Sequence, residues 1–364
     1  MTATAAAPLT YVHIGVGGFG QHWCTAVLPR LRALGLAVPV AAVDINPEVL
    51  GRAREQLGLA EGDLFTSAAR ALDERHPDFV TIVVPPASHE EMVGLAAAHG
   101  CHILSEKPIA DTMAACCRIY AKVRRAGLKM AVTMSHRFDQ DKQTLEREIR
   151  SGRHGRLSSL IGRNTWNCRA FGSWGRFRHE IADPLLVEGT VHHFDVVRAL
   201  TGADAQSVYA ATWNPPWGEF AGDSNALVTM VMTNGVRAFY EGNKTSAATL
   251  NGWTQDYFRA ECERATLELD NRRLRVISDL GGERAITEKA LARQPAWTNA
   301  WLAELFANWL NGGEAPPNAL EDNIQCCALL FAAVESAHTG QVVDVQEFLR
   351  KSLATTDASP DRAG

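Results

Sequence analysis

Residues 11–20, Tyr-Val-His-Ile-Gly15-Val-Gly17-Gly18-Phe19-Gly20, decide the fold of the N-terminal part of this chain. A short β-rich run ends in glycines with the spacing GxGxxG, and apolar residues three to four apart follow it, as on one face of a helix. In this context Gly15 permits a tight turn, Gly17 lets a pyrophosphate approach the backbone, and Gly20 lets the helix pack closely on the strand. The stretch predicts a dinucleotide-binding βαβ unit, with Gly18 and Phe19 also beside the cofactor.

The second strand of this unit ends in an acid. The apolar run 38–43 is followed by Asp44, 24 residues after Gly20. A carboxylate at this place accepts hydrogen bonds from ribose hydroxyls and repels a 2′-phosphate, so Asp44 predicts NAD rather than NADP. The alternative is that Asp44 only caps the turn before Asn46.

The hydrophobic pattern divides the chain into two parts. Over 1–134, strands alternate with helices, which predicts a Rossmann-type, doubly wound parallel sheet. Over 135–352 the strands become longer and more alternating, and few helices separate them, which predicts an α+β domain with a large, mostly antiparallel open sheet flanked by helices. Asn234-Gly235 between two apolar runs predicts a hairpin. Residues 353–364 are small and polar and are expected to form a disordered tail.

Composition narrows the function classes. The chain has 364 residues and a formal net charge of −5, which argues against nucleic-acid binding. We see no signal peptide and no stretch long enough for a membrane helix, so we expect a cytoplasmic protein. The eight cysteines contain two adjacent pairs and no CxxC, which favours reduced, buried thiols over disulfides or a zinc site.

Four short motifs occur in a specific order along the chain. Ser105-Glu106-Lys107-Pro108 follows the strand at 101–104, and Val84-Pro85-Pro86 with His89 lies before it. Arg137-Phe138 and the stretch 188–195, Glu-Gly-Thr-Val-His-His-Phe-Asp, come after it. With the glycine motif upstream, this order and spacing resemble the Gfo/Idh/MocA oxidoreductase family, which includes glucose–fructose oxidoreductase and inositol dehydrogenases. The resemblance covers the chain to about residue 345.

The resemblance implies a set of catalytic and cofactor residues. In the family, the lysine of Glu-Lys-Pro and a histidine on a helix contact the reacting hydroxyl, and an acid four positions earlier assists; these are Lys107, His192 and Glu188. Glu188 departs from the usual aspartate. Besides the glycine motif and Asp44, the residues implied at the cofactor are Pro85, Pro86, His89, Glu106, Lys107 and Arg137.

The chemistry explains why these residue types are needed. Hydride transfer from an alcohol carbon requires a base within reach of the hydroxyl proton, and histidine titrates near neutral pH. On a helix, Glu188, His192 and Asp195 would share one face, whereas His193 points roughly 100° away. These three residues could instead hold a metal ion; because a nicotinamide site already accounts for them, we expect no metal.

A segment rich in arginine and tryptophan, residues 163–179, suggests the substrate. Indole faces can stack on a sugar ring, and arginine suits an anionic group. We therefore expect a sugar or glycoside substrate, possibly anionic; the alternative is subunit-interface or core packing. The residues expected to contact it are Lys107, Arg163, Trp166, Trp174, Arg176, Arg178, His192, His193 and Asp195, with Asn243, Lys244, Trp253 and Tyr257 as further candidates.

The sequence thus predicts an NAD-dependent sugar or polyol dehydrogenase. Two alternatives remain, both found among relatives of the family that the chain resembles. One is a redox-neutral glycoside hydrolase that oxidises a sugar hydroxyl, eliminates the aglycone, adds water and returns the hydride. The other is a non-catalytic NAD-sensing regulator. The resemblance and an exposed second-domain sheet also suggest a homo-oligomer, either a dimer or a tetramer.

Overall fold

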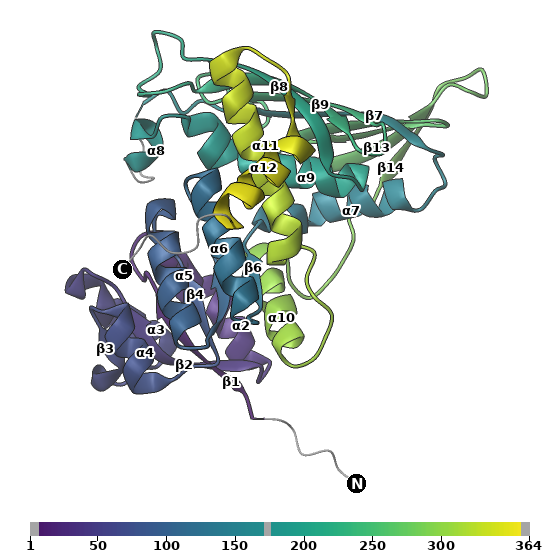
Figure 1. Cartoon of the computed structure of the whole chain (residues 1–364). Helices are drawn as coiled ribbons and strands as arrows, with labels where there is room; N and C mark the ends of the chain where they lie inside the picture. Colours follow the sequence, from purple (N-terminus) through teal and green to yellow (C-terminus); the bar gives the residue numbers. More distant parts are fainter. Residues whose placement is uncertain (1–6, 171–175, 358–364) are drawn as a thin grey trace. The chain divides into compact units, whose positions relative to one another are not determined.

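The computed structural model describes residues 7–170 and 176–357, which form two compact units (Figure 1). The first unit contains the chain up to Met134 and again from Asn299 to Ile324, and the second contains Ser135–Thr298 and Gln325–Thr355. The sequence predicted one boundary after residue 134. The structure adds that the chain returns, so that 299–324 cluster with the N-terminal part.

The first unit is built on a six-stranded parallel sheet with the strand order β3-β2-β1-β4-β5-β6. The strands are β1 (Leu9–Ile14), β2 (Ala37–Val43), β3 (Leu64–Phe65), β4 (Phe79–Ile82), β5 (His102–Ser105) and β6 (Met130–Val132). The helical elements are α1 (Phe19–His22), η1 (Trp23–Val27), α2 (Leu28–Ala33), η2 (Pro47–Val49), α3 (Leu50–Leu57), η3 (Glu61–Asp63), α4 (Ala68–Arg75), η4 (Pro86–Ser88), α5 (His89–Ala98) and α6 (Met113–Arg125), followed near the C-terminus by α10 (Thr298–Leu310).

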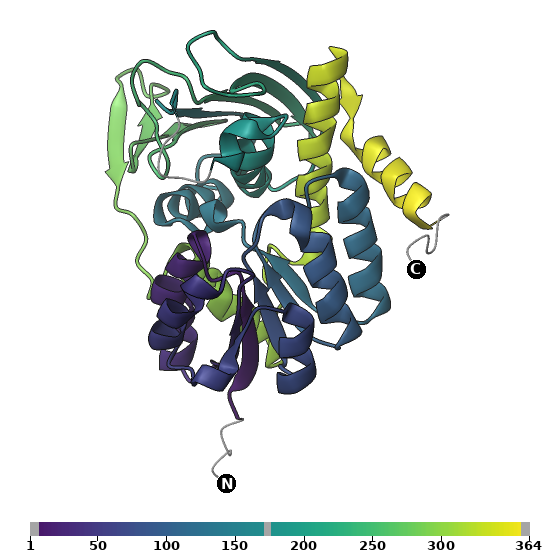
Figure 2. The ribbon, with the colours of Figure 1, turned by 90° about the vertical axis from the view of Figure 1, so that its left-hand side faces the viewer.

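Helices lie on both sides of this sheet (Figure 2). Every residue of β4 is therefore buried, which explains why Phe-Val-Thr-Ile is a continuous apolar and β-branched run rather than an alternating one. The predicted Rossmann-type sheet is confirmed. The sequence patterns did not predict the short strand β3 or the helix α4.

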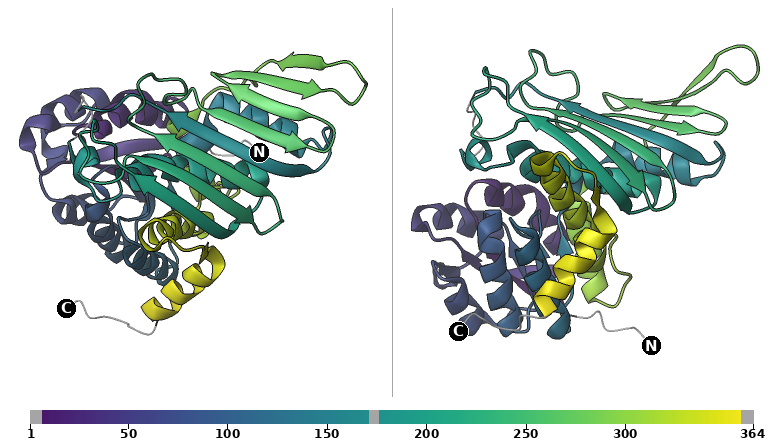
Figure 3. Two further views of the ribbon diagram at one scale, coloured as in Figure 1. Left: turned by 90° about the horizontal axis from the view of Figure 1, so that it is seen from above. Right: turned by 45° about the horizontal axis from the view of Figure 1, so that its top comes forward.

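The second unit contains a nine-stranded sheet, which Figure 3 shows face-on. Its order is β14-β13-β12-β11-β7-β10-β9-β8-β15, and every neighbouring pair is antiparallel except β7 and β10. The strands are β7 (Leu157–Thr165), β8 (Ala205–Trp213), β9 (Asn225–Met232), β10 (Arg237–Asn243), β11 (Tyr257–Cys262), β12 (Thr266–Asp270), β13 (Arg273–Ser278), β14 (Ala285–Lys289) and β15 (Val343–Asp344).

Helices cover one face of this sheet. The helical elements of this part of the chain are η5 (Ser135–Phe138), α7 (Gln140–Arg150), α8 (Phe177–Glu180), η6 (Pro184–Thr190), α9 (Val191–Thr201), α11 (Leu320–Thr339) and α12 (Val345–Asp357). Among them α7, η6 and α9 contact the sheet directly. Burial alternates along β9 and β10, as expected for strands with one covered face. The predicted hairpin forms, since the amide of Gly235 donates to the carbonyl of Met232 between β9 and β10. The predicted open, mostly antiparallel sheet is confirmed.

The structure also bears on three other expectations, which concern the C-terminal tail, the cysteines and membrane-spanning helices. Residues 353–357, which we expected in a disordered tail, form the end of α12, and the rest of that tail lies outside the described residues. All eight cysteines fall within the described ranges, where none forms a disulfide and seven are buried. None of the helices in those ranges combines the length and the apolar character required to cross a bilayer.

Candidate active site

The glycine turn between β1 and α1 brings three segments of backbone very close together. A Cβ placed on Gly15, whose φ is +86°, would lie 2.2 Å from the Val83 carbonyl oxygen, and one on Gly20 would lie 1.8 Å from the Gly15 carbonyl oxygen. Neither position accepts a side chain without moving backbone. Beside Gly18, by contrast, nothing lies within 4 Å. Packing of the protein itself thus requires Gly15 and Gly20, whereas the region around Gly18 has room for a ligand.

Asp44 holds this turn from the end of β2. Its Oδ2 accepts hydrogen bonds from the amides of Val16 and Gly17, each at 2.9 Å, and its Oδ1 accepts one from the amide of Asn46 at 2.9 Å. Asp44 therefore caps the following turn, as in the alternative interpretation, and also fixes a negative charge on the glycine turn.

The loops after β4 and β5 are tied together by His89. Its Nδ1 lies 2.9 Å from the carbonyl oxygen of Pro108, and its Nε2 lies 3.0 Å from that of Val84. The ring is fully buried, and burial lowers its pKa. The resemblance assigns His89 to the cofactor region; in the structure both ring nitrogens face backbone carbonyls, so the ring holds the two loops together. Pro85 is exposed and Pro86 half-buried on the first of these loops.

The Glu-Lys-Pro motif presents one buried and one half-buried charge. Glu106 accepts a hydrogen bond from the indole of Trp23 at 3.0 Å and one from the backbone amide of Lys107 at 3.2 Å. Burial raises the pKa of Glu106, and the nearby Lys107 opposes this rise. Lys107 is half-buried, and its bond to Pro108 is cis. Glu106 thus supports the turn that carries the lysine.

In the second unit, the two acids that the sequence analysis expected on one helical face, Glu188 and Asp195, lie in different helical segments, η6 and α9. Glu188 lies in the π-helical turn η6, where it forms a close ion pair with Arg178 and lies 3.2 Å from the ammonium of Lys244. Asp195 on α9 instead accepts a hydrogen bond from Arg137 at 2.7 Å. The two acids therefore bind different basic side chains.

Arg137, which the resemblance assigns to the cofactor, has a structural contact of its own. Its side chain is buried and bound to Asp195, so it fastens η5 to α9.

His192 lies at the start of α9 in an aromatic environment. Its ring centroid is 5.0 Å from that of Trp253, at 80° to it, and 5.8 Å from that of His136. Only 3% of His192 is exposed, but 37% of Trp253 is. Trp166 stacks at 6.4 Å on Trp253. Of the four tryptophan or tyrosine candidates, Trp253 therefore adjoins the predicted base, and Trp166 contacts Trp253.

The other residues expected at the substrate have protein partners. Arg163 donates to Asn251 at 2.9 Å and lies over the Tyr257 ring, and Arg176 pairs with Glu180 on α8. Trp174 falls outside the described residues. The amide of Thr245 caps the end of β10 by donating to Asn243.

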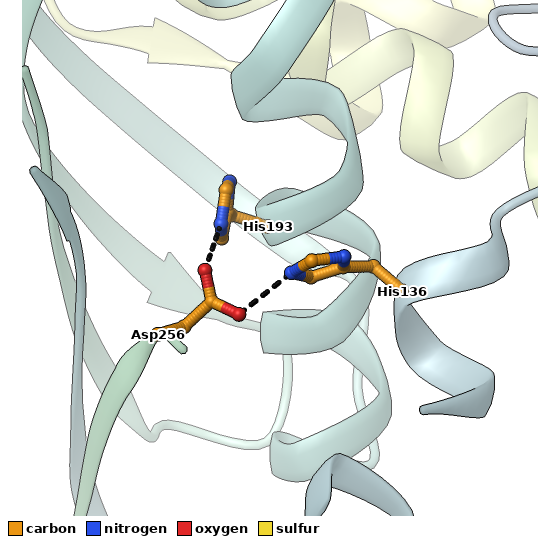
Figure 4. A group of neighbouring side chains, drawn as sticks. All are labelled: His136, His193 and Asp256. Carbon is orange, nitrogen blue, oxygen red and sulfur yellow. Dashed lines mark hydrogen bonds and ion pairs between the residues drawn. The ribbon is translucent and has the colours of Figure 1, made fainter. Parts of the chain in front are cut away.

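His193 belongs to a buried network that the sequence analysis missed. Figure 4 shows His193 and His136 pointing at the same carboxylate, that of Asp256, at 2.8 Å and 2.7 Å. Lys142 lies 2.7 Å from the same carboxylate. The other nitrogen of His193 lies 3.0 Å from the hydroxyl of Tyr240. Because both of its nitrogens bind protein groups, His193 supports α9 instead of offering a group to a substrate.

Comparison with known proteins agrees with this architecture. Residues 9–134 match a family described as "Oxidoreductase family, NAD-binding Rossmann fold", and residues 143–268 match the "GFO/IDH/MocA C-terminal domain". The chain belongs to the Gfo/Idh/MocA oxidoreductase family.

Relatives of this Gfo/Idh/MocA protein include enzymes that act on sugars. It is 46% identical over 354 residues to the uncharacterized protein y4oX of Sinorhizobium fredii, covering 94% of this chain and 98% of the relative. It is 27% identical to the D-apiose dehydrogenase of Paraburkholderia graminis, covering 95% and 92% of the two chains. Levoglucosan dehydrogenase, solved with NADH and levoglucosan, has the same fold, with a TM-score of 0.78, 22% identity and coverage of 93% and 99%.

Proposed function

We propose that this Gfo/Idh/MocA oxidoreductase transfers hydride between nicotinamide and the hydroxyl-bearing carbon of a sugar or polyol. Family membership supplies the oxidoreductase class and the NAD-binding domain. The substrate class is inferred from relatives named as D-apiose, myo-inositol and levoglucosan dehydrogenases and from Trp253 beside His192.

One observation in the first unit carries the proposal. The strand order reverses between β1 and β4, and dinucleotides bind at such a reversal, outside the carboxyl ends of the strands. The glycine turn leaves β1, and Glu106-Lys107 leaves β5, the strand next to β4. Lys107 therefore follows the strand next to the expected cofactor position, which supports its assignment to the substrate.

The residues around the glycine turn fit NAD. The space beside Gly18 can admit a pyrophosphate, and the Asp44 carboxylate is already held at the end of β2, where a ribose would lie. A 2′-phosphate would meet that fixed negative charge, so we infer a preference for NAD over NADP. Bound nicotinamide supplies the hydride acceptor.

The chain's own groups would handle the proton. We assign Lys107 to the substrate oxygen, where its ammonium stabilises developing negative charge, and His192 to the hydroxyl proton, as the family motif implies. Glu188 already balances Arg178 and Lys244. We therefore assign Glu188 to orienting η6 and the start of α9.

A substrate panel tests the proposal. Purified protein is offered pyranoses, myo-inositol, acyclic polyols and aryl glycosides, with NAD and NADP in separate arms, and both NADH and released aglycone are measured. We expect NADH from a cyclic or acyclic polyol, a lower KM for NAD than for NADP, and a loss of at least about 100-fold in kcat for Lys107→Ala. Lys107→Arg keeps the charge and serves as the matched variant, and we expect it to remain impaired because guanidinium geometry differs from that of an ammonium.

Other outcomes of the substrate panel would point to a different function or cofactor. Aglycone release that requires NAD without net NADH would identify the redox-neutral glycoside hydrolase. No turnover of any panel member, with NAD bound tightly, would favour a regulator. Stronger use of NADP would contradict the role given to Asp44.

A further inference from the structure

The six residues 251–256, which lead into β11, form a loop that is anchored at both ends. Asn251 is buried and donates to the carbonyl of Gln255 at 3.2 Å and to Asp270 at 3.0 Å. At the other end Asp256 is completely buried. Between them Thr254 has a φ of +68°, in the left-handed region that a β-branched residue rarely adopts. Strain of this kind persists only where surrounding contacts enforce it.

Asp256 is the stronger of the two anchors. Its Oδ2 receives His136 and Lys142, each at 2.7 Å, while its Oδ1 receives His193 at 2.8 Å and Asn164 at 2.9 Å. These donors come from η5, α7, α9 and β7. Burial alone would raise the pKa of Asp256, but His136 and Lys142 outweigh it and keep the pKa well below its usual range. The carboxylate is thus a fixed charge with two donors on each oxygen.

His136, His193 and Asp256 also have the spacing of a metal site, yet their surroundings point to another role. Lys142 already supplies a positive charge at Oδ2, and Lys142 in turn lies 3.2 Å from Asp141. A divalent ion would have to displace this ammonium. We therefore take Lys142 as the resident cation of the network.

Asn164 connects the two anchors. Its side-chain amide donates to the Asn251 carbonyl and to Asp256 Oδ1, both at 2.9 Å. One side chain on β7 therefore holds both ends of the loop to the sheet.

The loop carries Trp253 between the network and the predicted base. The indole lies 4.4 Å from the His136 ring and 5.0 Å from the His192 ring, with 37% of the residue exposed. We propose that Trp253 is the platform for the apolar face of a cyclic sugar beside His192, with Asn164 and Asp256 as positioning residues that hold it. This deepens the proposed function and rests on it.

The physical reason lies in ring geometry. A rigid sugar ring presents C–H groups together on one face, and an indole held in place can cover them without losing conformational entropy of its own. An acyclic polyol has no such preformed face. Trp253 should therefore favour cyclic over acyclic substrates, acting mainly on KM.

The test compares substitutions by their effect on KM and kcat. For the cyclic substrates of the panel, Trp253→Ala should raise KM by about tenfold, corresponding to an aromatic contact of about 1.4 kcal/mol, with kcat changed by less than about threefold. For glycerol or sorbitol the change in KM should stay within about twofold. Trp253→Phe should bring the KM for cyclic substrates most of the way back to the wild-type value. Trp217→Ala is the matched control, because Trp217 is 58% exposed and is held by Thr245 instead of the network.

The positioning role is tested by a double-mutant cycle. Asn164→Ala removes the side chain that joins the two ends of the loop, although other donors and acceptors still hold each end. It should raise the KM for cyclic substrates in the same direction as Trp253→Ala, and it should add little when Trp253 is already alanine. Asp256→Asn should behave similarly; if it does not fold, Asn164→Ala alone decides. Additive effects would overturn the positioning role, and equal KM changes for cyclic and acyclic substrates would overturn the platform. Wild-type protein without any NADH formation would instead refute the proposed function.

A metal analysis completes the test. Protein purified without chelator should hold no stoichiometric zinc or manganese, and kcat should survive EDTA. If the protein instead holds one equivalent of zinc or manganese and His136→Gln loses it, then Asp256 belongs to a metal site and not to a positioning network.

Discussion

His13 lies on β1 beneath the glycine turn and is completely buried. Its Nδ1 is 2.7 Å from the Thr81 hydroxyl, and its Nε2 is 3.4 Å from the Gly20 carbonyl. Burial lowers its pKa to about 4, so the ring is neutral near pH 7. In the unfolded chain the same imidazole has the usual histidine pKa of 6.5. Because the unfolded state binds the proton more tightly, the full free energy of unfolding is present above pH 6.5 and declines as the pH falls towards 4.

This linkage predicts an acid-sensitive fold. Across that window His13 should account for a loss of up to about 3 kcal/mol in the free energy of unfolding, and His136, whose pKa burial also lowers to about 4, adds to it. His13→Gln should reduce the fall in urea midpoint between pH 7 and pH 5. His338→Gln, at a side chain that is 60% exposed, is the control. An unchanged pH slope in His13→Gln would contradict the linkage.

At the scale of elements, the helical segment from α1 to α2 depends on its contact with β1. Gly20 lies at the closest approach, where an added Cβ would be 1.8 Å from the Gly15 carbonyl oxygen. That oxygen belongs to backbone and cannot swing away. A side chain here would push the start of the helix from the strand and deform the turn that Asp44 holds.

Gly20→Ala should therefore impair both stability and cofactor binding. We expect a loss of about 2 kcal/mol or more in the free energy of unfolding and at least a tenfold weaker Kd for NADH, measured by fluorescence. Gly51→Ala on α3 is the matched control, since nothing lies within 4 Å of its added Cβ, and helix propensity should make it neutral or slightly stabilising. Equal behaviour of the two variants would argue against the steric role of Gly20.

At the scale of the whole molecule, three strands of the nine-stranded sheet, whose ribbon Figure 3 shows face-on, carry exposed large apolar side chains. Tyr209 on β8 and Phe239 on β10 both pair with Thr229 on β9, and Leu227 lies two residues along β9 on the same face. They are 39%, 47% and 53% exposed, respectively. An apolar patch on adjacent strands is typical of an interaction surface, and we propose that a second copy of this chain covers it.

Charge placed on that face should separate the copies. Leu227→Glu with Phe239→Glu should reduce the molar mass measured by light scattering to that of one chain, while the fold by circular dichroism is kept. Leu280→Glu, at a residue that is 75% exposed in the turn between β13 and β14, should leave the mass unchanged. A wild-type protein that is already monomeric would remove the proposal.

Local patterns were enough to predict both sheets, the glycine turn and the hairpin at Asn234-Gly235, because each is encoded by neighbouring residues or by helix and strand periodicity. The return of residues 299–324 to the first unit was not predictable in this way, since no local pattern states which core an amphipathic helix will join. The same holds for His89 and Arg137, whose motifs suggest cofactor contacts but whose side chains bind protein groups.

The sequence alone therefore determined the family and the fold of the protein, and it predicts the residues at the cofactor and at the base. Only the tertiary structure revealed the Asp256 network and the position of Trp253, because the donors to Asp256 come from four elements up to 120 residues away along the chain. A buried carboxylate is stable only when such distant donors converge on it, and this convergence is a property of packing that no short stretch of sequence contains.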